Sequence, residues 1–212
     1  MIQQHAAKAT LTALTLVVTL GLAGCGISPT GSTGSSSASP PTSQMPSASS
    51  SSSTEAQFNT ADVLFVQGML PHHQQAVEMS DTLLEKAGVS AETTALAKQI
   101  KAAQQPEITT MQGWLKAWGQ SADTGMGGMT HGGTGDDGMA SAAQLKKFDQ
   151  ADGTAAEKMY LKLMTKHHQG AITMAETEVK DGQDPDAVRL ATSIATSQQA
   201  EIDTMQQLLG NL

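Results

Sequence analysis

The segment MLPHHQQAVEM at residues 69–79 returns 95 residues later as MTKHHQGAITM, at residues 164–174. Each copy has a His-His pair that follows one methionine and precedes another. A second segment, QQPEITTM at residues 104–111, returns 94 residues later as QQAEIDTM, at residues 198–205. The chain therefore contains a unit of two segments that occurs twice in the same order.

The four segments have the periodicity of helices that pack along a seam. Apolar and selected polar residues recur at alternating intervals of three and four, which keeps them on one helix face. Short turns inside each unit predict two helical hairpins. We expect an all-α fold, an antiparallel four-helix bundle built from two repeated hairpins over residues 58–212. The glycine-rich loop of residues 120–140 is long enough for the hairpins to swap between the two chains of a homodimer.

Capping signals set the bounds of the predicted helices. These signals are Asn59 and Gly88 around the first helix, Ser90 and Gly119 around the second, Thr154 with Glu157 at the start of the third, and Asp184 with Pro185 at the start of the fourth. The first and second helices are expected to end at about Ala87 and Trp118. A short additional helix is expected at about residues 142–150.

The first 24 residues (1–24) have the pattern of a signal peptide. Their apolar run, residues 11–22, is shorter than the roughly 20 residues that span a bilayer. The run leads into Leu-Ala-Gly-Cys, which resembles the lipobox of bacterial lipoproteins, and Cys25 is the only cysteine of the chain. The resemblance implies a lipid on Cys25, followed over residues 25–57 by a disordered Ser/Pro-rich tether. We expect an exported protein that is lipid-anchored to the outer face of the cell membrane, and a cleaved signal peptide with an incidental cysteine is the alternative.

Composition limits the functional classes. The formal net charge is −8, and no basic patch with interleaved aromatic residues is present, so nucleic-acid binding is not expected. The sequence has no nucleophile motif and no phosphate-binding loop, and it therefore does not predict an enzyme. Methionine is unusually frequent, with 12 residues.

Polar residues on the predicted seams indicate a buried site, because buried His, Gln and Glu side chains need partners or a ligand. Counting from the turn of each antiparallel hairpin places His72 at the level of Glu107, and His167 at the level of Glu201. His73 and His168 are expected beside the seam, as second ligands or on an access surface.

Imidazole and thioether groups together favour copper, especially Cu(I). The predicted metal ligands are His72, His73, Met69, Met79, Glu107, Met111, His167, His168, Met164, Met174, Glu201 and Met205. An accessory site in the glycine-rich loop would comprise Met126, Met129 and His131. The alternative is a structural network without metal, in which histidines pair with glutamates and methionines such as Met111 and Met205 fill the core.

The doubled His-His motif, with Gln-x-x-Glu-Ile-x-x-Met in each following helix, resembles the bacterial domain-of-unknown-function family 305 over roughly residues 58–210. The resemblance implies a helical, ferritin-like fold, export in many members and copper handling in some. One departure is Lys166, which stands where the first copy has Pro71. Pro71 lacks an N–H group, so we expect its helix to bend beside the first histidine pair.

Three functions remain open at this point. The first is a copper buffer or chaperone at the cell surface, which would require a copper-delivery partner. The second is a di-metal oxidase of ferritin type, but that class needs a glutamate three residues before each site histidine. Met69 and Met164 occupy those positions. The third is a structural or partner-binding lipoprotein without metal.

Overall fold

The computed structural model of the protein describes residues 57–122 and 137–212. They form the helices α1 (Thr60–Leu84), α2 (Ala91–Ala117), α3 (Ala142–Asp149), α4 (Gly153–Asp181) and α5 (Pro185–Gly210). No strand occurs in these two stretches, and the prediction of an all-α fold is confirmed. The predicted signal peptide, Cys25, most of the tether, and the loop residues Met126, Met129 and His131 lie outside the described residues.

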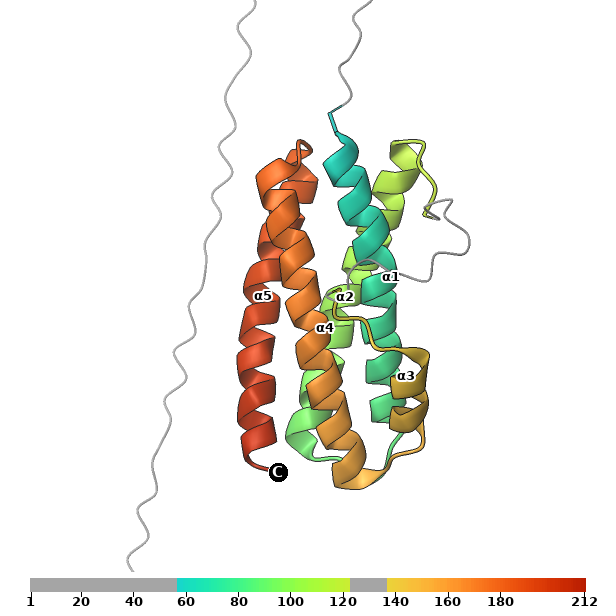
Figure 1. Ribbon diagram of the computed structural model, residues 1–212, viewed down its shortest axis with the longest axis vertical. Coiled ribbons are helices and arrows are strands. Elements are labelled where there is room, and N and C mark those ends of the chain that lie inside the picture. The colour runs from blue at the N-terminus through green and yellow to red at the C-terminus, as the bar shows by residue number, and fades with distance from the viewer. Residues whose placement is uncertain (1–56, 123–136) are drawn as a thin grey trace, which may run out of the picture. The chain divides into compact units, whose positions relative to one another are not determined.

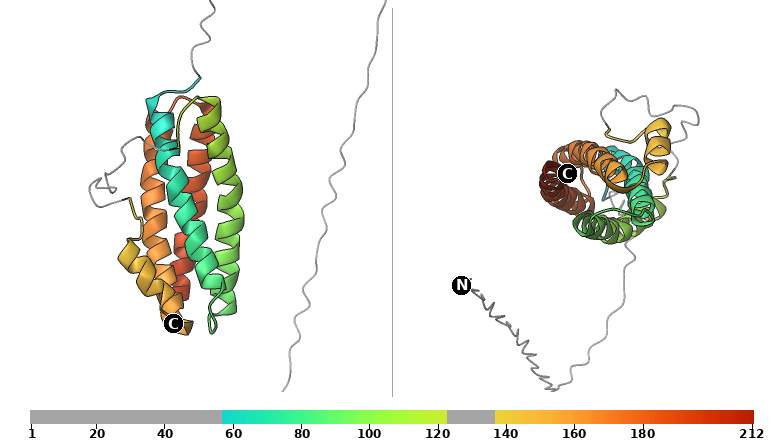
Figure 2. Two further views of the ribbon diagram at one scale, coloured as in Figure 1. Left: turned by 90° about the vertical axis from the view of Figure 1, so that its right-hand side faces the viewer. Right: turned by 90° about the horizontal axis from the view of Figure 1, so that it is seen from below.

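The four long helices lie side by side as a bundle, with consecutive long helices running in opposite directions (Figure 1). One hairpin is formed by α1 and α2, and the other by α4 and α5. The hairpins meet mainly through α1 and α4, which carry the two His-His pairs. The short helix α3 lies outside the ring of four (Figure 2). Among the described helices, none combines the length and apolar character needed to cross a bilayer.

The predicted caps of α1, α2 and α5 are observed, and they are Asn59, Ser90 and Asp184. The predicted capping box of Thr154 and Glu157 is wrong, because α4 begins after Asp152 and Glu157 bonds to the other hairpin. α1 ends at Leu84 instead of Ala87. Pro71 lies inside α1 and does not end it.

Two buried carboxylates at equivalent places of the repeat join the hairpins. Asp62, at the start of α1, accepts hydrogen bonds from the backbone N–H groups of Gln183 (3.0 Å) and Asp184 (2.9 Å) in the α4–α5 turn. Its counterpart Glu157, at the start of α4, accepts one from the hydroxyl of Thr93 (2.5 Å) in the first turn of α2. Each hairpin therefore binds the turn region of the other through a buried carboxylate. Because the Glu157 carboxylate is used in this contact, it does not cap α4.

Next to Asp62 the two repeats differ in a buried residue. Glu178 of α4 stands where α1 has Leu83, and each of the two side chains is buried. Burial, and then the neighbouring Asp62, raise the pKa of Glu178 to about 8, so this carboxyl group is protonated at neutral pH. In this protonated form Glu178 donates a hydrogen bond to the carboxylate of Asp62.

We expect Glu178→Leu, which restores the residue of the other repeat, to raise the thermal unfolding temperature, and to raise it more at pH 9 than at pH 5. The folded chain retains the Glu178 proton up to about pH 8, whereas the unfolded chain releases it near pH 4.5. The resulting stabilisation is complete below pH 4.5 and is lost as the pH rises through about 8. Circular dichroism melts of both proteins at the two pH values measure the difference. An equal gain at both would contradict a protonated Glu178.

Candidate metal centre

A layer of polar side chains crosses the middle of the bundle and divides its apolar core into two halves. In α1, the core residues before His72 belong to one half and those after His73 belong to the other. The same change occurs at the second histidine pair in α4. The layer comprises His72, His73, Gln104, Glu107, His167, His168, Gln198 and Glu201. Its four histidines are at most 1% exposed.

The two histidines of each pair make different contacts, because neighbouring positions on a helix point about 100° apart. His72 and His167 face each other across the contact between α1 and α4, with ring centroids 3.5 Å apart and ring planes inclined by 36°. His73 faces α2 within its own hairpin, and its Nε2 lies 2.8 Å from Oε2 of Glu107.

The second hairpin repeats the histidine–glutamate contact, with His168 Nε2 lying 2.8 Å from Glu201 Oε2. The predicted partners of the glutamates, His72 and His167, are therefore wrong by one residue in both repeats. Counting from the turn sets the level of a residue along the helix axis, and that level is correct. Rotation about the axis decides which histidine faces its hairpin partner, and counting does not determine it.

Three of the histidines have a defined donor nitrogen. Nε2 of His73 and of His168 meets a carboxylate, and Nε2 of His72 donates to the carbonyl oxygen of Asp137 at 2.9 Å. Because these oxygens are acceptors, each Nε2 carries the hydrogen and each Nδ1 keeps a free lone pair. Within the described chain these Nδ1 atoms, and both ring nitrogens of His167, have no hydrogen-bond partner. A histidine that an oxygen orients at one nitrogen is suited to bind a metal ion at the other.

Burial holds the imidazoles of His72, His167 and His168 in the neutral form. It lowers the pKa of His72 to about 3, with the adjacent His73 as the second cause. Burial and His72 also lower the pKa of His167, to well below its usual value. The pKa of His168 is lowered by burial, despite the opposing effect of Glu201. Since metal ions bind the neutral ring, these side chains are in their ligand form at neutral pH.

The predicted methionine ligands lie in two groups. Each methionine of one group is the repeat counterpart of a methionine in the other group. One half of the core contains Met69 and Met111 with Met174 packed against it, and the other contains Met164, Met205 and Met79. Each group draws on three of the four long helices. Thioether sulfur therefore occurs on both sides of the histidine layer, in positions that also fill the core.

A segment not anticipated from the sequence, residues 137–140, crosses from α1 to α4 beside the histidines. Its Ala140 N–H donates to the side-chain oxygen of Gln75 at 2.7 Å, and the Gln75 amide donates back to the Ala140 carbonyl at 3.0 Å. On α4, the counterpart of Gln75 is Gly170, where a Cβ atom would stand 1.9 Å from the Asp137 carbonyl oxygen. A side chain at position 170 would collide with this segment. The glycine that replaces Gln75 in the second repeat is therefore the sequence feature that could have revealed it.

Within residues 57–122 and 137–212, no three His, Cys, Asp or Glu side chains are close enough together to hold a metal ion by themselves. Glu107 and Glu201 are engaged by histidines, which makes them orienting groups for the rings. A metal ion in this layer needs further ligands, and the donor atoms of suitable type in the two adjacent core halves are methionine sulfurs.

The chain matches the family model described as Domain of unknown function (DUF305) over residues 62–209. Among solved structures, a DUF305 protein from Streptomyces coelicolor is 38% identical, with a TM-score of 0.65 over 71% of this chain and 93% of that chain. A DUF305 fragment from Deinococcus radiodurans is 32% identical, with a TM-score of 0.66 over 73% of this chain and 98% of that chain. No curated protein matches the sequence.

CopM is a further relative of known structure, solved in Cu(I)-bound, Cu(II)-bound, Ag-bound and apo forms. Its Cu(II)-bound form is 30% identical, with a TM-score of 0.60 over 71% of this chain and 96% of that chain. Since the family model spans most of the chain and two structures of the family share its helical domain, the protein belongs to the family described as Domain of unknown function, DUF305.

Proposed function

We propose that this domain binds copper in its polar layer, with a preference for Cu(I), and that the protein is a copper buffer or chaperone. The observation that carries the proposal is the set of buried imidazole nitrogens without partners in the described chain. A buried acceptor without a partner is destabilising by about 1–3 kcal/mol. Coordination to a metal ion satisfies such nitrogens.

The ligand types in the layer favour Cu(I) over Zn(II). Neutral imidazole binds both ions, but thioether sulfur is a soft donor that selects Cu(I). In the proposed centre, His72 and His167 are ligands, and His73 and His168 are ligands that the glutamates orient. Sulfur ligands are drawn from the two methionine groups. CopM, whose solved forms include complexes with Cu(I), Cu(II) and Ag, supports the assignment to copper.

A di-metal oxidase is less well supported by the same residues. That chemistry uses several carboxylate ligands, which Met69 and Met164 replace at the critical positions. In the described helices the two glutamates of the layer are bonded to histidines, and no group of three carboxylates or histidines converges.

We further propose that copper binding takes place outside the cytoplasm, on a protein held to the outer face of the cell membrane by a lipid on Cys25. The lipobox resemblance at residues 22–25 supports this location. The Streptomyces coelicolor relative, which is provisionally described as secreted, also supports export.

The combined change of Met69→Leu and Met164→Leu tests the sulfur ligands. Leucine keeps the apolar character and nearly the volume of methionine, so the fold should be retained. We expect Cu(I) affinity to fall by at least about tenfold, which corresponds to about 1.4 kcal/mol of binding free energy. Zn(II) affinity should change little. Competition titrations against a chromophoric chelator measure both ions.

Ile100→Val combined with Ile194→Val is the matched control, because these buried residues are also repeat counterparts and offer no ligand atom. This control should bind Cu(I) like the unchanged protein. If the methionine variant also keeps full Cu(I) affinity, these methionines are core residues and the preference for Cu(I) has another origin.

A further inference from the structure

Two grooves lie between α1 and α4, and their residues are counterparts in the repeat. The groove between the end of α1 and the start of α4 is covered by α3. In the covered groove, Phe148 of α3 is buried against Tyr160, with ring centroids 6.1 Å apart. The ammonium group of Lys86 lies 5.4 Å from the centre of the Phe148 ring and donates a hydrogen bond of 2.8 Å to the carbonyl of Asp149. The second groove lies between the start of α1 and the end of α4, and no other described helix covers it.

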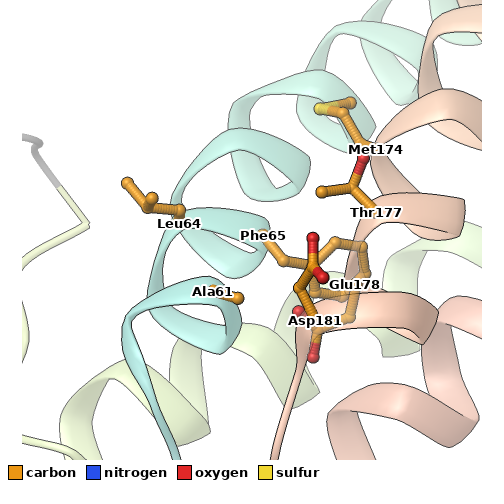
Figure 3. Close-up of a pocket in the computed structure, with 7 residues that line it drawn as sticks. All are labelled: Ala61, Leu64, Phe65, Met174, Thr177, Glu178 and Asp181. Carbon is orange, nitrogen blue, oxygen red and sulfur yellow. The ribbon is translucent and has the colours of Figure 1, made fainter.

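The open groove contains a cavity of about 410 Å³. Figure 3 shows the residues that line it, with Leu64 and Phe65 on α1 and Met174, Glu178 and Asp181 on α4. The walls are mainly apolar, and the carboxyl group of Glu178 is buried among them beside Asp62.

Residues of the open groove are more exposed than their counterparts beneath α3. Leu64 is 61% exposed, whereas its counterpart Met159 is partly buried against the core. Met174 is partly exposed, whereas its counterpart Met79 is 1% exposed. An apolar strip that one repeat covers is therefore uncovered in the other, and such strips mark interaction sites.

Charge distinguishes the two grooves. Asp181 stands where the covered groove has Lys86, and Glu178 stands where it has Leu83. The covered groove supplies a cation to its occupant, and the carbonyl of Asp149 accepts that cation's hydrogen bond. Glu178 is uncharged at neutral pH, so the charge of the open groove comes from Asp181, and an occupant that supplies a cation would complement it.

We propose that the open groove docks a short amphipathic helix of a partner protein, which inserts an aromatic side chain between α1 and α4 and presents a basic side chain to Asp181. α3 supplies the geometric precedent, since its Phe148 occupies the equivalent place and is preceded by Lys146 and Lys147. Met174 is the one residue lining this groove that also belongs to a methionine group of the proposed copper centre.

A synthetic peptide of α3 with its caps, SAAQLKKFDQ from residues 141–150, is a suitable probe. It is titrated into the full chain carrying ¹³C-labelled methionine methyl groups. We expect the Met174 signal to shift, with half-saturation at or below about 1 mM, and the Met79 signal beneath α3 to stay in place. A peptide in which alanine replaces the phenylalanine should bind at least about tenfold more weakly, because it loses the buried ring.

Asp181→Lys supplies the matched variant of the protein, because it introduces the residue of the covered groove at a half-exposed position. We expect peptide affinity to fall at least about tenfold, with copper binding unchanged. The proposal is overturned if Met174 does not respond up to 1 mM peptide, if Met79 shifts as much as Met174, or if Asp181→Lys binds the peptide as well as the unchanged chain does. The copper titration separates each of these outcomes from failure of the proposed copper centre.

Discussion

Replacing His72 and His167 together by glutamine is expected to lower Cu(I) affinity by at least about 100-fold, since loss of an orienting partner alone typically weakens metal binding 10- to 100-fold. The two rings face each other with centroids 3.5 Å apart and contribute to the layer three nitrogens that have no partner among residues 57–122 and 137–212. Glutamine can keep the hydrogen bond to the Asp137 carbonyl but offers no imidazole lone pair. Helicity should be retained. Competition titration measures the affinity, and circular dichroism follows the fold.

The same variant separates a metal centre from a structural network. In a purely structural network the histidines contribute to stability, so the variant loses thermal stability and its copper affinity does not change. In the proposed centre the loss is in copper affinity. A stable, helical variant that binds Cu(I) like the Ile100→Val, Ile194→Val control would show that these histidines are not ligands.

Much of the fold follows from local sequence rules. The repeated segments, the heptad spacing and the caps at Asn59, Ser90 and Asp184 are determined by neighbouring residues, and they predict the helices within a few positions. The start of α4 is predicted wrongly because the Glu157 side chain bonds to Thr93 of the other hairpin and does not cap its own helix. A contact between residues 64 positions apart has no local signal.

In the candidate site, too, local sequence rules predicted some features and contacts between the hairpins determined the others. The sequence placed His72, His167 and both glutamates at one level, with His73 and His168 beside the seam. It assigned the glutamates to His72 and His167, whereas the buried His73 and His168 make these contacts. That error is a rotation of about 100° about the helix axis. The contact between the two hairpins determines this rotation, and the hydrophobic pattern is too broad to resolve it.

Acid is expected to destabilise the copper-free protein strongly between about pH 6.5 and pH 3, because the folded chain holds neutral imidazoles that the unfolded chain protonates. The pKa of His72 is about 3 in the folded chain, against 6.5 for an ordinary histidine. The unfolded state therefore binds more protons in this interval, and the stability that His72 contributes is complete above pH 6.5 and is lost as the pH falls towards 3. The lowered pKa of His167 acts in the same direction.

The size of the effect follows from the relation between pKa and free energy, in which a difference of one corresponds to about 1.4 kcal/mol. His72 alone then accounts for several kcal/mol, against a total stability of about 5–15 kcal/mol for a domain. Denaturant titrations at pH 7, 5 and 4 measure the loss. Carboxylates also contribute to acid unfolding, so the decisive comparison is with His72→Gln, His167→Gln, which should keep more of its pH 7 stability at pH 4. If both proteins lose the same stability, these rings bind protons as readily in the folded chain as in the unfolded chain, and burial does not lower their pKa.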